Sequence, residues 1–153
     1  LARMERLMEN LKRELDLGAG SAIGGHKNIV DSTTITAAKT MTEADSGKVF
    51  KIDADGSAFD ITLPPNSTTG WNAVFVMTDV ASNDIDIVAQ TDDSIYGVHI
   101  DASPTRINAA KKLTFTGGTS VLGDIIIIEF SDGTNWYATT YGGANNAIAS
   151  SQA

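Results

Sequence analysis

Histidine and carboxylate side chains are the groups in this sequence whose types could support catalysis or metal binding. The chain has two histidines, His26 and His99, and no cysteine, so a metal site would need carboxylates to complete its ligand set. Asp101 lies two residues after His99 and therefore on the same face of an extended strand, but a polar surface pair explains this spacing more economically. We therefore predict no metal site and no cofactor.

The other carboxylates do not follow a catalytic or calcium-binding pattern. Asp53 and Asp55 resemble the start of a calcium loop, yet the closing Glu of that motif is missing, so an Asp-Gly turn at Asp55 explains the segment better. No Gly-x-Ser-x-Gly motif is present. Glycoside hydrolysis needs two carboxylates in one cleft, and the sequence does not place any pair there. We therefore predict that the protein is not an enzyme.

The distribution of charge separates a short first segment from the rest of the chain. The formal net charge is -8, but residues 1–17 contain four basic and four acidic side chains, so residues 18–153 carry the whole excess of negative charge. An acidic surface repels nucleic acid and anionic lipid. No stretch approaches the roughly 18 to 20 apolar residues of a membrane-spanning helix. We therefore expect neither nucleic acid nor a membrane as a partner.

Residues 1–17 have the spacing of an amphipathic helix. The apolar residues follow a 3,4,3,4 pattern, which is typical of the contact stripe of a coiled coil. They are Leu1, Met4, Met8, Leu11 and Leu15. A helix of this length is marginal alone in water, so the stripe needs a partner surface. We predict an anchoring or oligomerisation helix over 1–17, followed by a glycine-rich tether over 18–27. Packing of the stripe on the chain's own following domain is the second alternative.

From residue 28 the pattern changes to short strands separated by turn residues. This pattern predicts a mainly β protein, with a single antiparallel β-sandwich or jelly-roll domain over 28–142 and a flexible tail over 143–153. No strict repeat of 20 to 50 residues is present, which disfavours a solenoid. The candidate strands are residues 29–37, 48–53, 59–63, 73–79, 85–90, 95–101, 112–116, 124–130 and 135–141.

Two of these candidate strands should supply much of the core. Phe59, Ile61 and Leu63 alternate with polar residues, as in a strand with one buried face. Residues 125–128 are four consecutive isoleucines, which favours a central strand that is covered on both faces. On this basis the substitution Ile127→Asp should prevent folding.

Three segments resemble a β-module of phage particle proteins, which include capsid decoration proteins, head fibres and tail fibres. Residues 41–50 (MTEADSGKVF) and 59–64 (FDITLP) resemble the opening of that module, and residues 132–137 (DGTNWY) resemble its closing strand. The similarity spans roughly residues 34 to 142. It implies a virion β-domain that is commonly trimeric and has no cofactor or catalytic residues.

The resemblance and the sequence pattern together favour a capsid decoration or head-fibre protein on the particle surface. Such a protein would bind the major capsid protein or another virion protein through its first segment and form a homotrimer. The alternative is a tail-fibre or receptor-binding module for a host glycan, because aromatic faces stack on sugars. The residues for this contact would be Trp71, Tyr96 and Tyr137. Aromatic side chains also pack in cores or in trimer interfaces, and this is the role that we favour for Trp136.

Overall fold

The computed structural model describes residues 4–5, 29–54, 56–90 and 92–152, with side chains described from residue 34 onward in the second range. Met4 and Glu5 have helical backbone and exposed side chains. The remainder of the predicted helix over 1–17, with Leu1, Met8, Leu11 and Leu15, lies outside the described residues, and so does the whole of the predicted tether over 18–27.

The described part of the chain is mainly β, as predicted. It contains twelve strands and one short 3-10 helix, η1. The elements are β1 (Ile29–Ile35), β2 (Lys39–Thr40), η1 (Glu43–Asp45), β3 (Lys48–Ile52), β4 (Phe59–Thr62), β5 (Ala73–Met77), β6 (Ile85–Val88), β7 (Ile95–Ile100), β8 (Thr105–Ala110), β9 (Lys112–Phe115), β10 (Ile125–Ser131), β11 (Trp136–Tyr141) and β12 (Ile148–Ser151).

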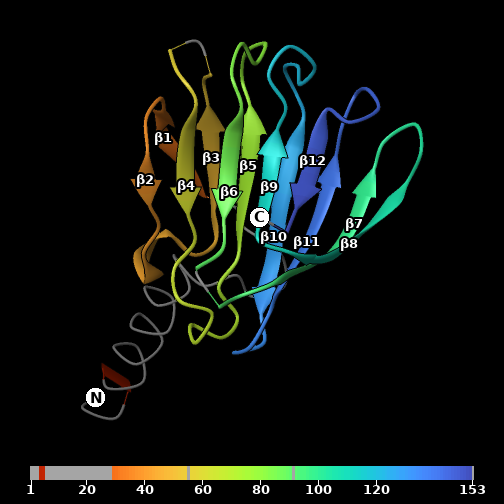
Figure 1. The fold of residues 1–153 in the computed structure, drawn as a ribbon. Coiled ribbons are helices and arrows are strands. Elements are labelled where there is room, and N and C mark those ends of the chain that lie inside the picture. Colours follow the sequence, from red (N-terminus) through yellow and green to blue (C-terminus); the bar gives the residue numbers. More distant parts are fainter. Residues whose placement is uncertain (1–3, 6–28, 55, 91, 153) are drawn as a thin grey trace.

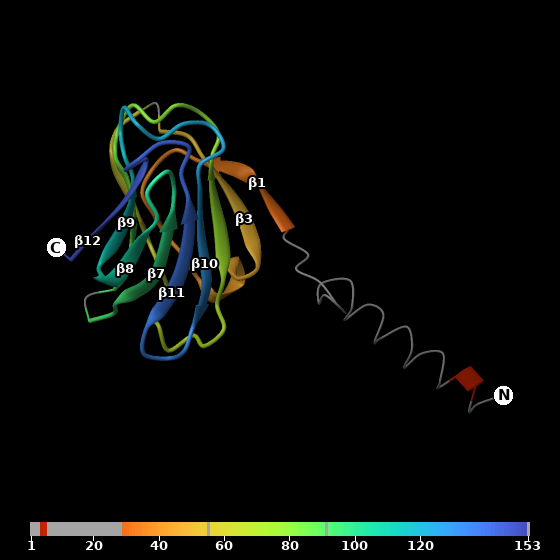
Figure 2. The ribbon, with the colours of Figure 1, turned by 90° about the vertical axis from the view of Figure 1, so that its right-hand side faces the viewer.

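The strands form two mixed sheets that share one hydrophobic core (Figures 1 and 2). The larger sheet has seven strands in the order β1-β3-β5-β10-β11-β7-β8, and the smaller has five in the order β12-β9-β6-β4-β2. Fully buried side chains come from both sheets, for example Phe50 and Phe75 from the larger sheet and Ile61 and Ile87 from the smaller. The two sheets are therefore held together by apolar burial between them.

The expectation of an antiparallel domain is wrong for half of the pairings between described strands. The pairs β1–β3, β3–β5, β2–β4, β4–β6 and β7–β11 are parallel. The first six strands alternate between the two sheets. After each strand the chain crosses to the other sheet, and its next strand in the first sheet runs in the same direction as the last one there. Parallel strands need a crossover connection, and here a strand of the opposite sheet provides it.

This alternating path forms without a sequence repeat. The strands β1, β3 and β5 begin at Ile29, Lys48 and Ala73, so the stretches of chain between successive strands of the larger sheet differ in length. The parallel register still stacks similar side chains, because Phe50 pairs with Phe75 and their rings stack 5.6 Å apart. The absence of a fixed period in the sequence therefore did not exclude a coiled path for the chain.

The isoleucine run forms part of β10, the central strand of the seven-stranded sheet. Ile126 and Ile128 are fully buried, whereas Ile125 and Ile127 face the other side and are partly exposed. The described residues thus cover only one face of this strand, instead of both. Ile126 and Ile128, rather than Ile127, are the residues whose replacement tests the core. In β4 and just beyond it, Phe59, Ile61 and Leu63 are buried, as their alternation predicted.

The chain from Ile148 to Ser151, which we expected to be part of a flexible tail, forms strand β12. It pairs antiparallel with β9, and the side chains of Ala147 and Ile148 are buried. The β-domain therefore extends beyond residue 142, and its last strand closes one edge of the five-stranded sheet.

Gly97 in β7 allows the close approach of β11, and this contact gives a stability test. A Cβ atom at Gly97 would lie 1.7 Å from the backbone oxygen of Ala138, and its φ is +154°. We expect Gly97→Ala to cost more than about 3 kcal/mol or to prevent folding, as overpacking against rigid backbone does. Gly118→Ala is the control, because its φ is +75° but no atom lies within 4 Å, so only a backbone strain of about 1 to 2 kcal/mol is expected. Urea unfolding measures both, and equal losses would contradict the contact.

Candidate functional site

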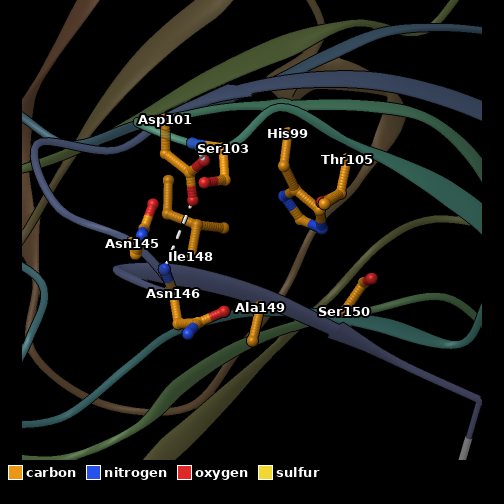
Figure 3. A pocket seen from close by; sticks show the side chains of 9 residues that line it. All are labelled: His99, Asp101, Ser103, Thr105, Asn145, Asn146, Ile148, Ala149 and Ser150. Atoms are coloured by element: carbon orange, nitrogen blue, oxygen red, sulfur yellow. Dashed lines mark hydrogen bonds between the residues drawn. The ribbon is translucent and has the colours of Figure 1, made fainter.

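A cavity of about 300 Å³ lies between the β7–β8 hairpin and β12 (Figure 3). Strand β8 is the edge of the seven-stranded sheet and β12 is the edge of the five-stranded sheet, so the cavity occupies the side of the domain where these two edges meet. This volume is at the lower end of those typical of ligand sites. It is lined by His99, Asp101, Ser103, Thr105, Asn145, Asn146, Ile148, Ala149 and Ser150.

His99 forms the inner wall of this cavity. The side chain is 5% exposed, and its Nδ1 atom lies 2.8 Å from Oγ1 of Thr140 on the neighbouring strand β11. In Figure 3 its ring extends from β7 toward the β12 residues Ala149 and Ser150. Nε2 is buried and has no hydrogen-bond partner. Burial lowers the pKa of the imidazole, and the nearby Asp101 carboxylate opposes this effect only in part, so the ring is neutral near pH 7.

Asp101 joins the two sides of the cavity. Its carboxylate accepts a hydrogen bond from the backbone N–H of Ser103 at 2.8 Å and another from that of Asn146 at 3.3 Å, and the second bond is drawn in Figure 3. Asn146 has a φ of +60°, a conformation that Asn tolerates better than most residues. The carboxylate therefore fixes the β7–β8 hairpin against the loop that leads into β12.

The chemistry of the lining suits a neutral, polar ligand. Amide and hydroxyl groups of Asn145, Asn146, Ser103 and Ser150 provide donors and acceptors, while the side chain of Ile148 is apolar. None of the lining residues is Lys or Arg, so an anionic ligand would meet the Asp101 carboxylate without a compensating cation. Hydroxyl groups of a sugar fit such a surface better than a phosphate or a carboxylate.

The described residues contain no group of three His, Cys, Asp or Glu side chains that could hold a metal ion. His99 and Asp101 line the same cavity. The polar surface pair that we expected from their spacing is wrong, because His99 is 5% exposed. Within the described range, no third ligand of these types joins them.

Two of the three aromatic residues predicted for glycan contact lie side by side on the seven-stranded sheet. Tyr96 of β7 pairs with Tyr137 of β11, and their ring centroids are 6.4 Å apart. Phe130 of β10 stacks on Tyr137 at 4.7 Å and is 43% exposed. We call these three residues the aromatic row. Tyr137 donates a hydrogen bond from Oη to Asp132 at 3.0 Å, an interaction that raises the pKa of the phenol and orients its ring.

Sequence reasoning missed Phe130, and it included Trp71, which lies elsewhere. The pairing of β10 and β11 shifts register between Ile128 and Phe130, and this irregularity brings Phe130 opposite Tyr137. Nothing in the sequence marks such a bulge. Trp71 is 1% exposed and packs edge-on against Trp136 at 5.6 Å, so its ring offers no open face to a sugar. Trp136 is fully buried, as we expected.

Comparison with family models, with curated proteins and with solved structures finds no match to this chain. Within the part of the chain that the structure describes, no helix has the length and apolar character needed to cross a membrane.

The neutral, buried imidazole of His99 predicts that the domain loses stability in mild acid. Because the folded pKa lies below the ordinary value of 6.5, the unfolded chain takes up this proton first. The free energy of unfolding should therefore be highest above pH 6.5 and fall as the pH drops from about 7 toward about 5. Urea unfolding across this range measures the slope.

His99→Gln removes the titrating group and should flatten that slope. His26→Gln is the matched control, because it also removes one histidine and changes none of the residues that line the cavity. The lowered pKa values of Asp45 and Asp132 place their titration below this pH window. An equal slope in the parent protein and in His99→Gln would show that the buried imidazole does not control the acid response.

Proposed function

We propose that this chain is a non-enzymatic virion structural protein of the capsid decoration or head-fibre type. Residues 1 to about 25 attach it to the major capsid protein or to another virion protein, and the β-domain is displayed on the particle surface. The chain works as a homotrimer. The two sheets form a β-sandwich, but not a jelly roll, because a jelly roll is antiparallel and half of the pairings between described strands are parallel.

The position of β1 is the observation that supports this division of roles. β1 is one edge of the seven-stranded sheet, and β8 beside the cavity is the opposite edge, with five strands between them. Residues 1–28 precede β1 in the chain, so an anchor there joins the domain at one edge. The side formed by β8 and β12 is then free to face away from the attachment point.

The segments that carry the resemblance are structural in this domain. In residues 41–50, Met41 and Phe50 are buried, and the Asp45 carboxylate accepts hydrogen bonds from the backbone N–H and the side-chain hydroxyl of Thr42. The carbonyl of Thr42 in turn accepts the indole N–H of Trp71 at 2.8 Å. These residues build the start of the domain instead of a ligand site, which supports the view that the motif identifies a module and not a catalytic centre.

Recognition of a host glycan is the second candidate function. It is favoured by the adjacent pair Tyr96 and Tyr137 and by the neutral, hydroxyl- and amide-lined cavity around Asp101. In that case the protein is a tail-fibre or receptor-binding module. Reproducible release of reducing ends from a surface polysaccharide would contradict the non-enzymatic part of both readings.

Attachment to the particle should depend on the apolar stripe of residues 1–17. Met8→Glu combined with Leu11→Glu places two charges in the stripe and should abolish binding to particles that lack the protein, because buried carboxylates are costly. Ala2→Glu combined with Asn10→Glu adds the same charge outside the stripe and should bind normally. Co-sedimentation with particles measures both. Full occupancy by the stripe variant would place the anchor in the β-domain.

The glycan reading makes a separate prediction about the aromatic row. If purified host polysaccharide binds the protein, Tyr96→Ala combined with Tyr137→Ala should weaken binding by about tenfold or more, since aromatic contacts dominate many binding surfaces. Tyr141→Ala is the control, because Tyr141 is also exposed on β11 but lies outside the aromatic row. Surface plasmon resonance on immobilised polysaccharide measures the difference. Unchanged affinity in the double variant removes the aromatic row from this role.

A further inference from the structure

We propose that the outer face of the seven-stranded sheet is a self-association interface that a second copy of this chain covers. The outer face is the side of β3, β5, β10, β11 and β7 that points away from the shared core. This inference rests on the proposed structural role and deepens it, because it names a surface within the β-domain through which two copies meet. The contact is two-fold, so it is separate from the three-fold association proposed for the homotrimer.

One row of paired residues runs across the middle of the outer face. Val49 of β3 pairs with Val74 of β5, and Val74 pairs with Ile127 of β10. The row continues through Thr139 of β11 to Val98 of β7. All five side chains are partly exposed. Four of the five are aliphatic, which is unusual for a sheet face in contact with water.

A second row lies beside the first and is also apolar at its centre. Val76 of β5 pairs with Ile125 of β10, which pairs with Tyr141 of β11. Tyr141 is 44% exposed. On the other side of the middle row, toward the opposite end of β11, lies the aromatic row. The patch therefore reaches five strands in the middle row, four in the second row, where Lys51 occupies the β3 position, and three in the aromatic row.

The five-stranded sheet has the opposite character on its own outer face and serves as an internal comparison. There Asp60 of β4 pairs with Asp86 of β6, and Asp86 pairs with Thr114 of β9. Asp86 also accepts a hydrogen bond from Nζ of Lys112 at 2.6 Å. The chain thus places polar residues at outward positions of one sheet and apolar residues at those of the other. Only the apolar outer face of the seven-stranded sheet needs an additional partner to shield it from water.

The size of the patch fits a second copy. Twelve positions, each about 4.8 Å by 6.8 Å, give roughly 400 Å² per chain. Two such faces in contact bury about 800 Å², which is the size of a weak, concentration-dependent contact. Apolar patches of this extent are among the largest on single soluble domains and are often functional.

Charge favours a second copy over a partner of another kind. The chain outside residues 1–17 carries the whole net charge of -8, yet the middle row of the outer face contains no charged residue between β3 and β7. The charged residues beside it are of opposite sign: Lys51 at the β3 end of the second row, and Glu129, which accepts a hydrogen bond from the hydroxyl of Thr139 at 2.7 Å. Two identical faces can therefore meet without setting only like charges against each other.

Substitutions on the two outer faces of the full-length chain test the inference. Val74→Lys combined with Ile127→Lys places two charges on adjacent strands of the apolar face. Thr62→Lys combined with Val88→Lys makes the same change at paired, partly exposed positions of the five-stranded sheet. Light scattering during gel filtration should show an oligomer for the parent and the control, and a smaller species for the Val74/Ile127 variant. A parent monomer at all concentrations, or a variant with the parent mass, would overturn the inference.

A labelling experiment keeps the inference testable if that variant does not fold. The chain has no cysteine, so Val74→Cys and Val88→Cys each introduce a single reactive thiol. Between dilute and concentrated protein, labelling at position 74 should slow by roughly tenfold, because association is driven by mass action, while labelling at position 88 should not change. Protection at position 74 that does not depend on concentration would mean that the chain's own first segment covers the face, and this overturns the inference. Particle attachment is measured separately, so its loss does not affect this result.

Discussion

Each strand of this domain has two faces, and the shared core covers only one of them. In β10, Ile126 and Ile128 point into the core and are fully buried, whereas Ile125 and Ile127 point away from it. A two-layer protein stabilises its inner faces by mutual burial, so its outer faces are left for other uses. The polar pairs on the five-stranded sheet meet water, and the apolar rows on the seven-stranded sheet do not suit it. The two outer faces are therefore suited to different surroundings, one to water and the other to an apolar partner surface.

Local pattern predicted the β class and part of the core, because alternation is a property of a single strand. The buried side chains of Phe59, Ile61 and Leu63 follow from their spacing alone. Strand pairing is not local, since nothing within β3 indicates that its neighbour is β5 and that the two run parallel. The cavity was not predictable for the same reason. Asp101 and Asn146 are 45 residues apart and meet only because β12 closes the edge of the smaller sheet. Phe130 reaches the aromatic row through a register shift that leaves no trace in the residue types.

The aromatic residues show how burial decides between roles that composition leaves open. Trp71 and Trp136 pack edge to face in the core, and each indole N–H has an acceptor, the Thr42 carbonyl for one and the Asp93 carboxylate for the other. Buried Trp side chains generally need such a partner. Tyr137 instead lies on the outer face with its hydroxyl bound to Asp132. The sequence presents both types as aromatic residues beside turns, and only their positions relative to the core separate them.

The two proposed uses of the seven-stranded sheet compete for the same residues. The aromatic row belongs to the outer face, so a second copy that covers this face also covers Tyr96 and Tyr137 and removes them from contact with a glycan. The cavity is not affected in this way. It is built from the inner side of β7, from the β7–β8 hairpin and from β12, at the edges of the two sheets, and association through the outer face leaves those edges open. If the assembled protein binds a sugar, the cavity around Asp101 is therefore the compatible site, and the aromatic row is part of the contact between copies.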